Sequence, residues 1–242
     1  MVSESPERRS AVVLGAAGGI GQACVRRLRH DEFDVVGVDL DERVLDVPDC
    51  VGIVGDVTDA AVLARAFAAC PSRPAVLVHS VLAERRIPLA ELTVEDWRTV
   101  LDVSLVSAWQ AGVELRRAAA GEPASLVLLG SIHAHGAMLG MATYAVAKLG
   151  LVALAKAMAA EWGPEGLRCN VVEPGFVAVP RNQARSADPD LLAAYPLGRA
   201  CQPAEIADVV AFLAGSQSSY VNGTSVLVDG GALAVLGPER PR

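Results

Sequence analysis

The sequence predicts an α/β protein whose core is a mostly parallel sheet covered by helices on both faces. Short uninterrupted apolar runs alternate with longer helical stretches along most of the 242 residues, and such runs are typical of strands buried on both faces. Hydrophobic residues make up 52% of the chain but aromatic residues only 4%, which suits parallel strands packed by helices. A glycine-rich turn joins the first strand to the first helix, as in a βα unit.

Charge and cysteine content argue against several classes of partner. A net charge of -7 argues against nucleic acid or an anionic membrane. Five cysteines are scattered without a CxxC pair, which indicates buried thiols in a reducing compartment. The polar N-terminus lacks the apolar stretch of a signal peptide, and the best candidate for a membrane span, 149–160, is short and contains Lys156. We expect a cytoplasmic protein with one domain, because no repeat or linker interrupts the chain.

The first βα unit has the glycine pattern of a dinucleotide site. Residues 10–14 read as a strand, followed by GAAGGIG at 15–21 and a helical stretch that ends near His30. Gly15 allows a tight turn, and Gly19 and Gly21 let the backbone and the helix N-terminus approach a pyrophosphate. The position of the glycines between a strand and a helix is the context that supports this interpretation.

The second strand, 34–38, ends at Asp39, about twenty residues beyond the glycine loop, where dinucleotide folds place an acidic residue. A carboxylate there accepts hydrogen bonds from the adenosine ribose hydroxyls and repels a 2′-phosphate. Asp41 and Glu42 add to the repulsion, and no basic residue follows until Arg43. We therefore expect NAD rather than NADP. The alternative is that Asp39 caps a turn.

The next segments place two further acidic residues. A short stretch containing Pro48 separates Asp39 from a strand at 51–54, so the connecting helix must be abbreviated or absent. Asp56 follows that strand, and it either meets the adenine edge or caps the helix that starts near Asp59.

A fourth strand, 75–78, leads into His79 and Ser80. Thr93 then opens a helix as its N-cap residue with Asp96 three positions later, which resembles a capping box. This helix carries Trp97, Asp102 and Ser104.

The second half continues the alternation. Residues 124–130 form a strand that delivers Ser131 at its carboxyl end, where ligands bind in open parallel sheets. The alanine-rich run 141–162 favours a helix. A polar segment, 181–189, breaks the alternation and is a candidate substrate-facing loop. The remaining expected elements are a strand at 167–172, a helix at 203–214 and a strand at 225–228.

Tyr144 and Lys148 are four residues apart within the expected helix 141–162 and so share one face. A free phenol has a pKa near ~10, and a cation close by favours the phenolate, so we expect Lys148 to lower the pKa of Tyr144. The alternative is an ordinary surface pair, with Ser131 merely ending a strand, because the YxxxK pattern alone is short and common.

Taken together, the motifs resemble the short-chain dehydrogenase/reductase family over about residues 10–231. The resemblance rests on their order and spacing, including the thirteen residues from Ser131 to Tyr144. It implies a Rossmann-type doubly wound fold with a seven-stranded parallel sheet, a dinucleotide-binding domain at 11–231 with tails at 1–10 and 232–242, and a homodimer or homotetramer packed through helices near 97–118 and 144–162. The motifs are GAAGGIG at 15–21, Asp39, Asp56, Ser131, YAVAK at 144–148, RCNVVEPG at 168–175, PLGR at 196–199, PAEIADVVAFLA at 203–214 and VDGG at 228–231.

The resemblance also implies roles for individual residues. Tyr144 would exchange a proton with the substrate oxygen while hydride passes to or from a nicotinamide, and Ser131 would hold that oxygen. Lys148 would bind the nicotinamide ribose. Ser131, His133 and Tyr144 are the expected substrate contacts. The expected cofactor-binding residues are Gly15, Gly19, Ile20, Gly21, Asp39, Asp56, Val57, Ser80, Tyr144, Lys148, Pro174, Gly175 and Val177.

Four positions depart from the family pattern. Leu14 stands where a threonine usually precedes the glycine loop, and HSVL at 79–82 replaces an NNAG-like turn that this threonine supports. Ser104 occupies the position of an asparagine that completes the catalytic set by anchoring a water and lysine chain; it remains a candidate because a small hydroxyl can also hold water. Val179 replaces a threonine that bonds the carboxamide.

Other polar residues near these motifs have two interpretations. His133 and His135 either line the substrate pocket or are loop histidines, and His79 is expected to fill the altered turn. Residues 84–86 read as a solvated loop, although an arginine there can meet an acidic substrate.

Two classes of function follow. The first is an NAD-dependent dehydrogenase or reductase that interconverts a secondary alcohol and a ketone on a small or cyclic substrate. Local similarity to cyclic diol dehydrogenases of the family points to a ring. The second is a protein of the same fold with non-redox chemistry or a mainly binding role, as the altered turn at 79–82 and the missing asparagine suggest.

Overall fold

The computed structural model describes residues 8–136 and 138–235, and within them seven parallel strands form one sheet in the order β3-β2-β1-β4-β5-β6-β7. The predicted fold class is therefore confirmed. The strands are β1 (Ser10–Leu14), β2 (Asp34–Asp39), β3 (Cys50–Val54), β4 (Pro74–His79), β5 (Ala124–Leu129), β6 (Leu167–Pro174) and β7 (Ser225–Val228).

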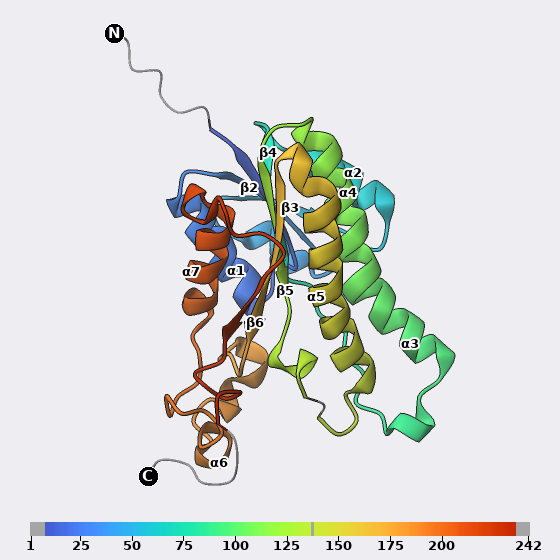
Figure 1. The fold of residues 1–242 in the computed structure, drawn as a ribbon, viewed down its shortest axis with the longest axis vertical. Helices are drawn as coiled ribbons and strands as arrows, with labels where there is room; N and C mark the ends of the chain where they lie inside the picture. The colour runs from blue at the N-terminus through green and yellow to red at the C-terminus, as the bar shows by residue number, and fades with distance from the viewer. Residues whose placement is uncertain (1–7, 137, 236–242) are drawn as a thin grey trace.

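Helices cover both faces of the sheet. Helices α1 and α7 lie on one side, and α2, α4 and α5 lie on the other (Figure 1). The strand order reverses between β1 and β4, and the crevice at such a reversal is where open parallel sheets bind ligands. The helices are α1 (Gly19–His30), α2 (Ala60–Ala68), α3 (Val94–Leu101), α4 (Ser107–Ala119), α5 (Ala142–Trp162), α6 (Pro189–Leu192) and α7 (Pro203–Ala214).

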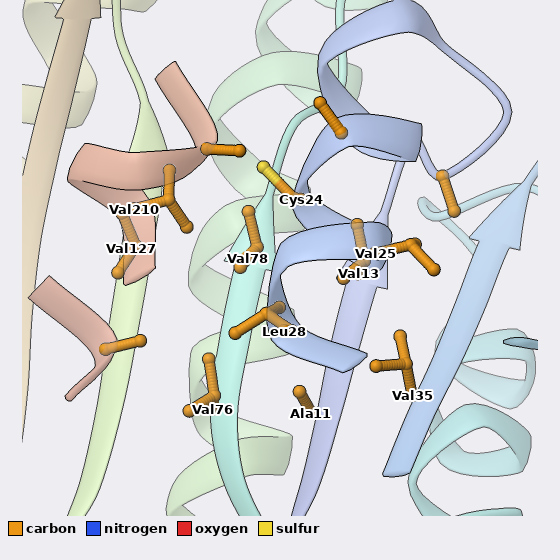
Figure 2. Close-up of a cluster of buried hydrophobic side chains, with 14 of the residues drawn as sticks. Ala11, Val13, Cys24, Val25, Leu28, Val35, Val76, Val78, Val127 and Val210 are labelled. Atoms are coloured by element: carbon orange, nitrogen blue, oxygen red, sulfur yellow. The ribbon is translucent and has the colours of Figure 1, made fainter. Parts of the chain in front are cut away.

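Two hydrophobic clusters fill the layers between the sheet and its helices. Alternate residues of a strand point to opposite faces, so Val13 packs in one cluster while Val12 packs in the other. Figure 2 shows Val13 and Val78 of the sheet together with Leu28 of α1 on the first side. This burial on both faces explains why the strand sequences read as continuous apolar runs.

Most element boundaries match the sequence-based expectations. The strands at 10–14 and 225–228 and the helix at 203–214 are as predicted, and the long helix begins at Ala142, one residue late. The predicted abbreviation between β2 and β3 is confirmed, because a single 3₁₀ helix, Glu42–Asp46, connects them. Strand β6 runs two residues further than predicted and ends at Pro174.

The helix that starts after Thr93 differs from its expected form. Its capping box is confirmed: the Asp96 carboxylate accepts from the Thr93 backbone N–H at 3.0 Å, and the Asp96 N–H donates to the Thr93 hydroxyl at 3.1 Å. However, the expected regular helix through Ser104 is interrupted by a π-helical segment, Asp102–Val106, between α3 and α4. The wider turn accommodates one additional residue, and such turns occur often at functional sites.

Helix α5 corrects the expectation that no apolar stretch reaches membrane-spanning length. The 24 residues Ala142–Glu165 have the length of a span, and an 18-residue window within them has a mean hydropathy of 1.3. The helix continues beyond 149–160 in both directions, to Ala142 and Trp162, so the apolar run alone underestimated its length. The same measures fit a long helix packed on a core, and α5 lies along β6 with Leu151, Ala155 and Met158 buried.

Candidate active site

The expected site residues come from several elements that end or begin at one edge of the sheet. Ser131 follows β5, Pro174 ends β6, and Tyr144 lies in the first turn of α5. In Figure 1 the start of α5, the carboxyl end of β6 and the segment containing α6 all lie at the lower end of the molecule. Parallel strands bring these loops together because all their carboxyl ends meet at the same edge.

Lys148 is buried beside Tyr144. Its ammonium nitrogen lies 5.5 Å from the centre of the Tyr144 ring and donates to the Leu129 carbonyl oxygen at 2.6 Å. Burial lowers the pKa of Lys148 to about 8, and the charge of Arg181 acts in the same direction. Because burial disfavours the charged form of Lys148, its ammonium depends on nearby hydrogen-bond acceptors such as the Leu129 carbonyl.

The pKa of Tyr144 differs from its expected direction. We expected Lys148 to lower it, but burial of the phenol raises the pKa of Tyr144 above its usual value. A hydrogen bond to Ser131 and the charge of Arg181 act in the opposite direction, and the charge of Glu84 raises the pKa further. Lys148 donates to Leu129 rather than to the phenol, which explains why desolvation dominates.

Ser131 and His133 complete a contiguous group with Tyr144. The Ser131 hydroxyl and His133 Nδ1 are 3.0 Å apart, and the His133 backbone N–H donates to the same hydroxyl at 3.2 Å. The His133 ring lies edge-on to Tyr144, with ring centres 5.6 Å apart. Burial lowers the pKa of His133, and the charge of Arg86 acts in the same direction, so the neutral imidazole is favoured.

His135 belongs to a different cluster, which the sequence did not reveal. Its Nε2 lies 3.0 Å from a carboxylate oxygen of Glu173, and the Ser225 hydroxyl also donates to that oxygen. Glu173 is fully buried, and its second oxygen has no hydrogen-bond partner among the described residues. Since 38 residues separate His135 from Glu173, no local spacing signalled this contact. The pair joins the loop after Ser131 to β6 and β7.

The glycine loop leaves no room for side chains. Gly15 has a φ of +82°, and a Cβ on it would lie 2.4 Å from the Ser80 carbonyl oxygen. A Cβ on Gly21 would lie 2.0 Å from the carbonyl oxygen of Gly15. The N-cap residue of α1, Gly18, makes no side-chain capping bond, so it leaves the first backbone N–H groups of the helix available to a ligand. This arrangement fits a pyrophosphate.

Asp39 joins the glycine loop to the end of β2. Its carboxylate accepts from the Ala17 backbone N–H at 2.9 Å and from the Asp41 N–H at 3.1 Å. Asp41 in turn binds the Arg43 side chain, with 2.9 Å from Nε to the carboxylate. Arg43 is therefore paired with an acid, and both observations fit a ribose site without a 2′-phosphate.

The remaining expected cofactor residues surround this loop. Asp56 is exposed and accepts from the Thr58 N–H and hydroxyl at 2.9 and 2.8 Å. Of the two alternatives for Asp56, capping of the next helix is wrong, since Asp59 is the N-cap residue of α2; contact with the adenine edge stays a prediction. Val57 is buried against the core, and Ile20 is partly buried against it.

The segment after β6 folds back toward the glycine loop. A Cβ on Gly19 would lie 2.8 Å from the Val179 side chain. Asn182, which sequence reasoning missed, holds this segment: its amide oxygen accepts from the Val179 N–H at 2.9 Å, and its amide nitrogen donates to the Val177 carbonyl at 3.0 Å. Pro174 and Gly175 lead from the end of β6 into this segment, and Val177 is tied to it by Asn182.

The two departures at Leu14 and His79 belong together, as expected. These residues are register partners on β1 and β4, and both are fully buried. Leucine offers no hydroxyl to the turn, and His79 instead contacts Ser107 of α4, with 2.8 Å between Nε2 and the hydroxyl. Ser104 is fully buried, and its hydroxyl has no hydrogen-bond partner among the described residues. Ser104 thus lies in the π-helical segment. Within the described part of the chain its hydroxyl makes no hydrogen bond to Tyr144 or Lys148.

Comparison with known proteins gives consistent matches along nearly the whole chain. A family described as enoyl-(acyl carrier protein) reductase matches residues 15–232. Cis-4-hydroxycyclohexanecarboxylate dehydrogenase of Sinomonas cyclohexanicum is 34% identical over 249 residues, covering 97% of this chain and 100% of that protein. Mouse (3R)-3-hydroxyacyl-CoA dehydrogenase is 33% identical over 248 residues, covering 91% of this chain and 95% of that protein.

Solved structures agree with these matches. An oxidoreductase of the short-chain dehydrogenase/reductase family from Burkholderia thailandensis superposes with a TM-score of 0.87 at 32% identity, covering 94% of each chain. A gluconate 5-dehydrogenase from Burkholderia cenocepacia, in complex with NADP and tartrate, gives a TM-score of 0.85 at 27% identity and covers 95% of this chain and 97% of that one. The fold, the motifs and these matches together show that the chain belongs to the short-chain dehydrogenase/reductase family.

Proposed function

We propose that this protein is an NAD(H)-dependent dehydrogenase that interconverts a secondary alcohol and a ketone on a small or cyclic substrate. Membership of a family of oxidoreductases whose relatives act on hydroxyl groups supports the general reaction. The observation that carries the proposal is the contiguous group of Ser131, His133 and Tyr144 with Lys148 buried beside it, at the sheet edge that also carries the glycine loop.

The side chains divide the chemistry among themselves. Tyr144 exchanges the proton of the substrate hydroxyl, and Ser131 donates a hydrogen bond to the same oxygen. The buried ammonium of Lys148 stabilises the phenolate form when the proton leaves, because charges interact more strongly away from water. A bound nicotinamide supplies the hydride acceptor or donor. Holding the substrate oxygen between two fixed groups contributes several kcal/mol, roughly, to lowering the barrier.

NAD is the preferred cofactor in this proposal. The Asp39 carboxylate lies beside the glycine loop, where it would accept bonds from ribose hydroxyls and repel a 2′-phosphate. Arg43, the first basic residue after it, is held by Asp41. Some structural relatives were solved with NADP, so the choice of cofactor needs a direct test.

The relatives bear on the substrate class, and the surface of the protein bears on its oligomeric state. The name of the Sinomonas enzyme, a hydroxycyclohexanecarboxylate dehydrogenase, supports a cyclic secondary alcohol as the substrate. We also propose a homodimer or homotetramer, because α4 and α5 expose the apolar residues Trp109, Val113, Val146 and Leu149. A cytoplasmic location remains a prediction.

Turnover tests the proposal. We expect purified protein with NAD to form NADH, followed at 340 nm, with cyclohexanol or cis-4-hydroxycyclohexanecarboxylate as probes, and the Ser131→Ala variant to be slower by about a hundredfold. The Ser125→Ala variant is the control, since Ser125 is buried and its hydroxyl donates to Leu213 on the other side of the sheet. If no secondary alcohol or ketone reacts while the protein is folded, a non-redox or binding role would replace the dehydrogenase proposal.

A further inference from the structure

His79 lies at the carboxyl end of β4 with no exposed surface, and its hydrogen bonds fix its tautomer. The Ser107 hydroxyl donates its single proton to the Val103 carbonyl oxygen at 2.6 Å. Therefore the 2.8 Å contact between Ser107 and His79 must use a proton on Nε2 of the imidazole. His79 Nδ1 is then an acceptor, buried and without a hydrogen-bond partner among the described residues.

Ser107 is the residue at which the π-helical segment closes. Its backbone N–H donates to the carbonyl of Asp102, five residues earlier, and its hydroxyl donates to Val103, four residues earlier. Because His79 donates to the same hydroxyl, the imidazole connects the end of β4 to the wide turn of the helix. We call the three groups His79, Ser107 and the π-helical segment Asp102–Val106 the latch.

The latch packs against α5, the helix that carries Lys148. Helix α4 packs against β4, and α5 packs against the π-helical segment. The charge of Lys148 contributes to lowering the pKa of His79, second to burial, which places the two side chains within electrostatic reach. Two further buried hydroxyls, on Ser104 in the latch and on Thr143 just before Tyr144, have no hydrogen-bond partner among the described residues. Buried polar atoms without partners cost free energy and concentrate at functional sites.

We propose that His79 is a positioning residue: through Ser107 it holds the π-helical segment against α5 and thereby keeps the ammonium of Lys148 in its buried place beside Tyr144. In the family, an asparagine at the position of Ser104 anchors the water and lysine chain. In this protein the latch supports the lysine instead. The consequence for turnover rests on the proposed dehydrogenase function, whereas the effect on Lys148 does not.

An uncharged imidazole suits the position of His79, because Lys148 is a cation within electrostatic reach of it. Burial lowers the pKa of His79 to about 3, so the imidazole carries no charge that would repel Lys148 at any pH near neutrality. Replacing His79 by an uncharged residue therefore changes no charge between pH 6 and pH 10. Burial is the largest cause that lowers the pKa of Lys148, and the guanidinium charge of Arg181 is the second. A change in the pKa of Lys148 in such a variant would report its position and hydration.

The chain offers a direct measurement, because Lys148 and Lys156 are its only lysines. Protein labelled with ¹³C-lysine gives two side-chain signals to follow by NMR from pH 6 to pH 11, and a Lys156→Arg variant assigns them. We expect Lys148 to titrate near 8 in the unsubstituted protein. In Ser107→Ala and in His79→Leu, water reaches the loosened site, and the pKa should rise by about half a unit or more toward its usual value.

Matched variants separate positioning from general loss of stability. Ser125→Ala removes another buried serine hydroxyl, bonded to Leu213 at 2.9 Å, and should leave the pKa of Lys148 unchanged. His79→Gln keeps a donor for Ser107 and should restore the pKa that His79→Leu shifts. The double variant His79→Leu/Ser107→Ala should shift it no further than either single variant, since both remove the same hydrogen bond.

An unchanged pKa of Lys148 in the latch variants would contradict the positioning role. If Ser107→Ala and His79→Leu lower the melting temperature as Ser125→Ala does but leave the pKa of Lys148 unchanged, the latch is only structural and the proposal is wrong. Should His79→Leu fail to fold, Ser107→Ala and His79→Gln decide the question. In turnover with NAD and cyclohexanol, the latch variants should lose about tenfold in kcat with KM for NAD within about twofold. Absence of any turnover would count against the proposed function and leave the lysine titration as the test of the latch.

Discussion

The cofactor side and the catalytic side of the sheet edge differ in how their polar groups are satisfied. Around the glycine loop, both carboxylate oxygens of Asp39 accept backbone hydrogen bonds. The catalytic side contains all four buried side-chain polar atoms that lack a partner in the described part of the chain: His79 Nδ1, Ser104 Oγ, Thr143 Oγ1 and Glu173 Oε1. Each such atom costs about 1–3 kcal/mol. Among the described residues, the unpartnered side-chain groups therefore concentrate on the catalytic side, whereas on the cofactor side the groups without a side-chain cap are the first backbone N–H groups of α1.

The largest expected effect is on the catalytic side. Replacing Tyr144 with phenylalanine removes the proton-exchanging hydroxyl and should lower kcat by about 10²–10⁴-fold. Because the cofactor side is unchanged, we expect the Kd for NADH to stay within about twofold. Turnover measured at 340 nm and NADH fluorescence check the two parts. Undiminished turnover in this variant would show that Tyr144 is not the acid/base.

The corresponding change on the cofactor side is Gly21→Ala. Its Cβ would lie 2.0 Å from the Gly15 carbonyl oxygen, so the loop must move, and we expect a loss of about 1–3 kcal/mol in the free energy of unfolding together with weaker NADH binding. Gly136→Ala is the control, because a Cβ there meets nothing within 4 Å. Urea denaturation and an NADH titration of both variants measure the difference. Equal effects in the two variants would contradict the close packing of the backbone around Gly21.

A third prediction concerns the cost of burying Lys148. Its pKa falls from 10.5 in the unfolded chain to about 8 in the folded protein, so between these values the unfolded chain holds more protons and stability rises with pH. The cost is fully present below pH 8 and disappears as the pH approaches 10.5. The stability of Lys148→Met relative to the unsubstituted protein should therefore be higher at pH 7 than at pH 10 by roughly 2–3 kcal/mol, on top of a pH-independent cost of leaving the Leu129 carbonyl without its donor.

Comparison of the two proteins by urea denaturation at pH 7 and pH 10 isolates this contribution, since the buried cysteines that also titrate at high pH are common to both. The free energy of unfolding of Lys148→Met relative to the unsubstituted protein should fall as the pH rises. A difference that is independent of pH would mean that Lys148 has its ordinary pKa in the folded protein.

The smallest expected effect sharpens the account of the cofactor side. Asp39→Asn removes the charge that repels a 2′-phosphate but keeps an oxygen for the Ala17 N–H, so the ratio of NADPH to NADH affinity should rise by about tenfold. Fluorescence titration with each cofactor gives this ratio. Asp56→Asn serves as the control, because the exposed Asp56 carboxylate binds only Thr58 in the described hydrogen bonds. An unchanged ratio in Asp39→Asn would remove the basis for the NAD preference.

The sequence was sufficient for the sheet and for the main groups of the site. Strands such as 10–14 are buried on both faces and so read as continuous apolar runs, and the four-residue spacing places Tyr144 and Lys148 on one face of α5. The glycine loop and Asp39 were predictable because a strand, a turn and a helix follow one another directly, which fixes their geometry locally.

Other features depend on contacts that spacing does not reveal. The direction of the Tyr144 pKa follows from burial and from the hydrogen bond of Lys148 to Leu129, neither of which the YxxxK pattern contains. The Glu173 and His135 contact spans 38 residues. The π-helical segment ends at Ser107, whose hydroxyl bonds to Val103 and to His79 of β4. The helical pattern of the sequence contains neither contact, so it predicted a regular helix there.

The central claim is that the chain is an NAD-dependent member of its family, and a calorimetric titration of the purified protein with NADH and with NADPH tests it most directly. We predict that NADH binds at least tenfold more tightly than NADPH, about 1.4 kcal/mol in binding free energy, because Asp39 lies beside the glycine loop. Binding of neither cofactor would contradict the dehydrogenase account and would mean that the changes at Leu14 and His79 have removed the cofactor site.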